Sequence, residues 1–109
     1  MKNNNTDQIT VEDFEMLAKE IQGSTLPPVI QKRFLSILEN LKENGNEALL
    51  VNDLFKGIEG ISTYNCFGTF NLFLKKNVPG GYKLESLQKS KHGVHWSKQQ
   101  IRLVKQQAG

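Results

Sequence analysis

The sequence contains a single cysteine, three prolines and no long apolar run. One cysteine, Cys66, cannot form an internal disulfide or supply a cysteine-rich zinc site. No stretch of about 18 apolar residues is present to cross a bilayer, and the first residues lack the basic and apolar segments of an export signal. We therefore expect a cytoplasmic protein without a membrane partner.

Catalytic groups are equally scarce. A chain of 109 residues, 38% of them hydrophobic, can form one domain with a core but has little room for an enclosed active site. The basic half has no paired carboxylates for acid–base chemistry. His92 and His95 lie three residues apart, but no third ligand is expected near them. We therefore predict no enzymatic activity, no catalytic residue, no cofactor and no metal site.

Positive charge is scarce in the first half of the chain and abundant in the second. Residues 1–54 carry five basic and nine acidic side chains, a net charge of −4, whereas residues 55–109 carry nine basic and two acidic side chains, a net charge of +7. Clustered lysines gain free energy by releasing the counterions condensed on nucleic acid. The asymmetry favours a polyanionic partner, and a merely solvated basic surface is the alternative.

Helical spacing of apolar residues predicts two helices in the acidic half. The first covers 11–22, and Thr10 with Asp13 forms a capping box at its start. Two prolines at 27 and 28 suit the opening turn of a second helix, which continues to Asn44. Residues 47–51 are predicted as a short strand or extended connector.

A brief helix follows, and then a longer one with two unlike faces. Asn52 or Asp53 is expected to cap the brief helix. Ser62 is expected to cap the longer helix over 62–76, whose apolar face includes Cys66, predicted to be a buried and inert thiol. The opposite face is polar apart from one leucine. It presents Tyr64, Asn65, Gly68, Thr69, Asn71, Leu72, Lys75 and Lys76.

Turn residues at 77–81 predict the end of this helix, and a long β-hairpin is expected after it. With a two-residue turn at His92-Gly93, the numbers of paired residues sum to 185. Two apolar pairs then share the face toward the core. They are Tyr82 with Leu103 and Leu84 with Ile101.

The other face of this predicted hairpin is strongly basic. Its cations are Lys83, Lys89, Lys91, Lys98 and Arg102. Trp96 shares this face with Leu87 and Val94, where it can pack against them or join a dimer contact. A C-terminal helix beginning at Ser97 is the alternative to the second strand, because Ser97 and Gln100 have the spacing of a capping box.

Four segments and their order are similar to the winged helix-turn-helix family. They are FLSILENL at 34–41, VNDLFKG at 51–57, GIST at 60–63 and GGYKL at 80–84. The resemblance covers residues 27–104 and implies an α+β fold, a winged helix-turn-helix with an additional N-terminal helix and a long C-terminal β-hairpin as the wing. It also implies binding of double-stranded DNA, usually as a homodimer, with Ser62–Lys76 as the recognition helix and Tyr82–Val104 as the wing.

The whole chain also resembles the relaxosome accessory proteins of conjugative plasmids. That resemblance implies binding at an origin of transfer, together with other relaxosome proteins. A winged-helix transcriptional repressor or replication protein is the alternative within the same class. A winged-helix protein–protein interaction module, whose basic wing meets an acidic partner, is the alternative from another class.

The predicted recognition helix contains no arginine and no glutamine, the commonest readers of guanine and adenine besides asparagine. DNA contacts are therefore expected mainly on the hairpin. The tip supplies Lys89, Lys91 and His92, and the shaft supplies Lys98 and Arg102, the arginine being best suited to bidentate recognition. Contacts from the helix come second, from Thr63, Tyr64, Asn65, Thr69, Lys75 and Lys76.

A single domain is predicted over residues 9–105, between mobile segments at 1–8 and 106–109. The first helix is expected either to cover the core or to mediate self-association. An exposed Leu72 would fit a dimer contact.

Overall fold

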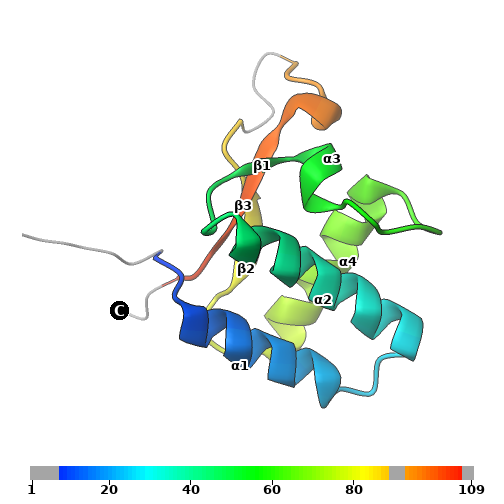
Figure 1. The fold of residues 1–109 in the computed structure, drawn as a ribbon, viewed down its shortest axis with the longest axis vertical. Helices are drawn as coiled ribbons and strands as arrows, with labels where there is room; N and C mark the ends of the chain where they lie inside the picture. The colour runs from blue at the N-terminus through cyan, green and yellow to red at the C-terminus, as the bar shows by residue number, and fades with distance from the viewer. Residues whose placement is uncertain (1–7, 89–92, 107–109) are drawn as a thin grey trace, which may run out of the picture.

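A computed structural model describes residues 8–88 and 93–106 of the chain. Within these residues four α-helices and a three-stranded antiparallel sheet pack together, so the predicted α+β class is confirmed (Figure 1). No helix in the described part of the chain has both the length and the apolarity needed to cross a membrane.

The first two helices form where the sequence predicts them. Helix α1 spans Val11–Gln22 and begins with the predicted capping box, in which Thr10 Oγ1 accepts from the Asp13 amide and the Asp13 carboxylate accepts from the Thr10 amide. Helix α2 spans Pro28–Glu43, with Pro27 as its N-cap. The two helices lie side by side, with α1 at the lower end of the molecule and α2 directly above it (Figure 1).

The short elements that follow differ slightly from the prediction. Strand β1 is Leu49–Leu50 and helix α3 is Val51–Leu54, so α3 begins before the predicted caps Asn52 and Asp53. Its N-cap, Leu50, makes no side-chain cap hydrogen bond. Val51 and Leu54 are buried, and burial of these two side chains, rather than a polar cap, fixes where this turn of helix begins.

Helix α4 spans Thr63–Asn77, and Ser62 caps it as predicted, accepting from the Asn65 amide at 3.1 Å. Its apolar face enters the core, where Phe70 meets Phe34 of α2 edge to face with ring centroids 4.9 Å apart. Cys66 is buried on this face, as predicted.

The sheet has the order β1-β3-β2, with β2 at Lys83–Ser86 and β3 at Gln100–Val104. The predicted register is wrong by two residues, because Leu84 lies opposite Leu103 and the numbers of paired residues sum to 187. A shift of two keeps every side chain on its predicted face. The four predicted core residues are accordingly buried: Tyr82, Leu84, Ile101 and Leu103.

The predicted long hairpin is also wrong in length. Pairing ends where the Gln88 side chain accepts from the Gln100 amide at 2.7 Å, and the chain then leaves the sheet. A 3-10 helix, η1, forms at Trp96–Lys98, so neither a continuous strand nor a C-terminal helix starts at Ser97. The described residues of the β2–β3 connection, 87–88 and 93–99, lie at the end of the molecule opposite α1, and η1 lies beside α3 (Figure 1).

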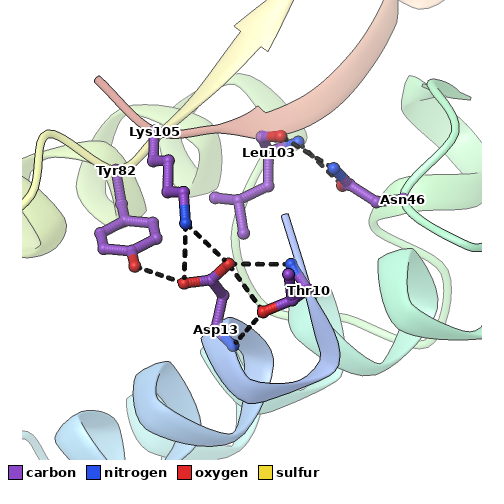
Figure 2. A network of polar contacts seen from close by, with 6 residues as sticks. All are labelled: Thr10, Asp13, Asn46, Tyr82, Leu103 and Lys105. Carbon is purple, nitrogen blue, oxygen red and sulfur yellow. Dashed lines mark hydrogen bonds and ion pairs between the residues drawn. The ribbon is translucent and has the colours of Figure 1, made fainter. Parts of the chain in front are cut away.

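Two asparagine side chains pair with strands as a neighbouring strand would. Asn71 of α4 accepts from the Leu84 amide at 2.7 Å and donates to its carbonyl at 3.1 Å. Asn46 makes the same pair of bonds with Leu103 of β3, at 3.2 and 2.9 Å (Figure 2). Both pairs satisfy backbone groups that would otherwise lie unpaired at a strand.

A polar cluster fastens α1 to the sheet (Figure 2). The Asp13 carboxylate accepts from Tyr82 Oη at 2.6 Å and forms an ion pair with Lys105 Nζ at 3.1 Å, in addition to its bonds with Thr10. Burial raises the pKa of Asp13, but the hydrogen bonds from Tyr82, Thr10 and Lys105 outweigh burial and lower the pKa to about 2. Burial and the Asp13 carboxylate raise the pKa of Tyr82 to about 12.

The C-terminal segment closes over the turn between α4 and β2. Gln106, predicted to begin the mobile tail, donates its amide to the carbonyls of Gly80 and Gly81 at 3.1 and 3.2 Å. Gly81 has a φ of +72°, and a β-carbon there would lie 2.5 Å from Cβ of Gln106. Only glycine therefore allows this approach.

Candidate nucleic-acid interface

One side of α4 is largely exposed. Tyr64 is 65% exposed and Leu72 is 52% exposed, and Asn65, Thr69, Lys75 and Lys76 are exposed as predicted. We call this the α4 surface. It consists of Tyr64, Asn65, Gly68, Thr69, Leu72, Lys75 and Lys76. Asn71, expected on the same face, is instead half-buried and held by β2.

Gly68 lies in the middle of the α4 surface without an evident structural need. A β-carbon at this position would meet no described atom within 4 Å, and its φ is not positive. Glycine inside a helix costs about 1 kcal/mol relative to alanine. The fold gains nothing from the missing side chain, and the helix backbone is left open at this position.

The 3-10 helix η1 docks on the first turn of α4 through Trp96. The indole Nε1 donates to Thr63 Oγ1 at 2.9 Å. The Trp96 ring also meets Tyr64 and Phe67 edge to face, with centroids 5.2 Å apart in both pairs. The predicted packing of Trp96 on a hairpin face is therefore wrong, and η1 extends the α4 surface at its N-terminal end.

The basic residues of the predicted hairpin are placed on different elements. Lys98 is exposed in η1 rather than on a strand. Arg102 is half-buried on β3 opposite Glu85, and it already has an interaction partner. Lys83 is exposed and lies 4.0 Å from Glu85, a separation at which a surface ion pair contributes little. Lys89, Lys91 and His92 lie outside the described residues.

The remaining polar residues of α4 keep groups available to a partner. Thr69 Oγ1 donates to the Cys66 carbonyl at 3.1 Å, which leaves its lone pairs free to accept. Lys75 and Lys76 are exposed in the last turn, where positive charge also suits the helix dipole.

Groups that would support other chemistry are not assembled in the described residues. Cys66 is buried, and burial raises the pKa of its thiol despite the opposing charge of Arg33, so it is not poised as a nucleophile. Within residues 8–88 and 93–106, no three histidine, cysteine or acidic side chains come together as a metal site would require.

Comparison with protein-family models, with curated proteins and with solved structures finds no match. The functional proposal therefore depends on the chain's own residues and geometry.

Two features of the site were not predicted from the sequence. The Trp96–Thr63 contact joins residues 33 positions apart, which no periodicity reports. Gly68 carried a usable signal, since an exposed glycine in a helix interior is unfavourable.

Proposed function

We propose that this protein binds double-stranded DNA in a sequence-specific manner, as a winged helix-turn-helix module in which α4 is the recognition helix. The β2–β3 connection forms the tip of the wing. The element order from α2 to β3 and the sheet order β1-β3-β2 support this assignment. The α4 surface enters the major groove, with Gly68 at the point of closest approach to the DNA.

The observation that carries the proposal is the docking of η1 onto α4. The bond between Trp96 and Thr63 holds η1, which carries Lys98, against the first turn of α4. Lys98 lies at one end of this surface, and Lys75 with Lys76 lies at the other. Lys89, Lys91 and His92 belong to the same connection in sequence. A duplex lying along α4 would therefore meet cations at both ends of the helix.

Selection from a random duplex library tests this proposal. We expect enrichment of one short sequence, repeated at a fixed spacing because a homodimer binds two half-sites. If no sequence is enriched and the protein binds an acidic peptide as tightly as it binds duplex DNA, the protein-interaction module is favoured instead. Light scattering of the free protein measures whether it is a dimer.

The position of the selected sequence distinguishes the cellular roles. A site within an origin of transfer supports the proposed role as a relaxosome accessory factor in conjugation. A site within a promoter or an origin of replication supports a repressor or a replication protein.

A further inference from the structure

A hollow of about 300 Å³ lies between the start of α2 and the second half of α4. Leu26 and Ile30 line one side, Leu72 and Phe73 line the other, and Phe34 also borders it. Its volume is at the lower end of the range for pockets that bind small molecules. The walls are therefore suited to an apolar group too small to be a folded partner.

Arg33 places a positive charge at the edge of this apolar hollow. Its side chain lines the pocket, and its Nε is buried with no hydrogen-bond partner among the described residues. The guanidinium lies against Gly60, where a β-carbon would be 2.8 Å from Nη2. Gly60 has a φ of +83°. A glycine at this turn thus makes room for the half-buried Arg33 side chain, which forms no ion pair within the part of the chain that the structure describes.

A buried donor without an acceptor costs free energy that a bound anion would recover. A carboxylate fits best, because its two oxygens match the planar fork of a guanidinium. Lys76 also lines the pocket and supplies a second positive charge. The required occupant therefore has an apolar body and one acidic end.

We propose that the pocket between α2 and α4 binds a small amphipathic carboxylate, with its carboxylate at Arg33 and its apolar body between Ile30 and Phe73. This site is additional to the proposed DNA interface. The pocket opens beside the α4 surface and shares Thr69, Leu72 and Lys76 with it, but ligand binding can be measured without DNA.

Titration of the uniformly ¹⁵N-labelled full chain with octanoate, followed by NMR, tests the proposal. Octan-1-ol, which has the same chain length and no charge, is the matched probe. We expect amide shifts that centre on Leu26, Ile30 and Phe73, with octanoate binding at least tenfold more tightly than octanol. Equal affinity for the two probes, or octanoate shifts that miss these residues, would overturn it.

Variants of α2 then show which positive charge binds the carboxylate of octanoate. Arg33→Gln is expected to weaken octanoate binding at least tenfold and to leave octanol binding unchanged. Lys32→Gln, which removes the same charge from the adjacent exposed position, is expected to change neither affinity by more than twofold. Octanoate binding that survives Arg33→Gln would contradict the assignment. The comparison of the two probes uses the unmodified chain, so it decides the matter even if a variant fails to fold.

Discussion

Asp13 is the residue on which attachment of α1 to the sheet most depends. Its carboxylate is buried and bonded to Thr10, Tyr82 and Lys105 at the same time. Because the pKa of Asp13 is lowered from 3.8 to about 2, the charged form stabilises the fold at every pH above about 4. This contribution is lost as the pH falls from about 4 to 2.

We predict that Asp13→Asn lowers the free energy of unfolding by about 1–3 kcal/mol at pH 7. Urea unfolding at a series of pH values measures the difference between the variant and the unmodified chain. The difference should shrink between pH 4 and pH 2, where the unmodified chain loses its own charge. Asp53→Asn, at an exposed position of α3, is the control and should cost less than 0.5 kcal/mol. An Asp13→Asn effect that stays constant down to pH 2 would contradict the role of the charge.

The same cluster predicts a second pH dependence at the alkaline end. The pKa of Tyr82 is raised from 10 to about 12, so its protonated form is favoured in the folded state. The contribution of Tyr82 to the free energy of unfolding is complete below pH 10 and is lost as the pH rises toward 12. Tyr82→Phe should therefore remove the part of the alkaline destabilisation that falls between pH 10 and 12, measured by the same unfolding experiment.

A substitution at Gly68 is expected to change fold stability and DNA affinity in opposite directions. We predict that Gly68→Ala stabilises the protein by about 0.5–1 kcal/mol, because alanine is the better helix former and has open space around it. The same variant should bind the selected duplex at least fivefold more weakly, measured by fluorescence anisotropy, since the methyl group blocks close approach.

Gly45→Ala is the contrasting variant. Gly45 also has open space around it, but its φ of +65° disfavours alanine, so this change should destabilise the fold and leave DNA affinity unchanged. Unchanged DNA affinity of Gly68→Ala would remove α4 from the interface.

At the scale of the element, the docking of η1 on α4 combines one side-chain hydrogen bond with ring contacts of Trp96. Trp96→Phe and Thr63→Val each remove the Nε1–Oγ1 hydrogen bond while retaining most of the apolar contact. We predict that each costs about 0.5–1.5 kcal/mol and that the double variant costs about 1 kcal/mol less than the two changes added together. Thermal or urea unfolding followed by circular dichroism measures this cycle, and strictly additive effects would show that the bond contributes nothing.

The elements also show which parts of the fold can be predicted from sequence. Helices α1, α2 and α4 and the caps at Thr10 and Ser62 were predictable, since they depend on residues within one or two turns. The faces of β2 and β3 were predictable because alternation is local. Their register and the η1 turn were not, since both depend on contacts between side chains far apart in the sequence, such as Gln88 with Gln100 and Trp96 with Thr63.

In the candidate site, too, the features that depend on local sequence were predictable and those that depend on distant contacts were not. Periodicity predicted the exposure of the α4 surface correctly, because the opposite face of the helix is strongly apolar. It could not predict that Asn71 is used by the sheet or that Trp96 covers Thr63, since these contacts depend on how the sheet and the connection pack against α4. The basic composition of the second half was evident from the sequence, but the elements that carry each cation were not.

At the scale of the whole molecule, the proposed DNA interface uses the basic half of the chain. Replacing Lys89 and Lys91 with alanine should weaken duplex binding about tenfold or more. This loss of affinity should be larger than the loss caused by combining Asn65→Ala with Thr69→Ala. The matched control is Lys19→Ala with Lys42→Ala, which removes the same charge from α1 and α2 and should change affinity less than twofold. A larger effect in the Asn65 and Thr69 variant would assign the main contacts to α4.

The most direct test of duplex binding is the dependence of affinity on salt concentration. On logarithmic axes, the binding constant for the selected duplex should fall linearly with salt, with a slope of about −3 or steeper because several phosphates are neutralised. The Lys89 and Lys91 double variant should reduce the magnitude of this slope by about 2. Affinity that does not change with salt, or the absence of duplex binding at low salt, would contradict the account.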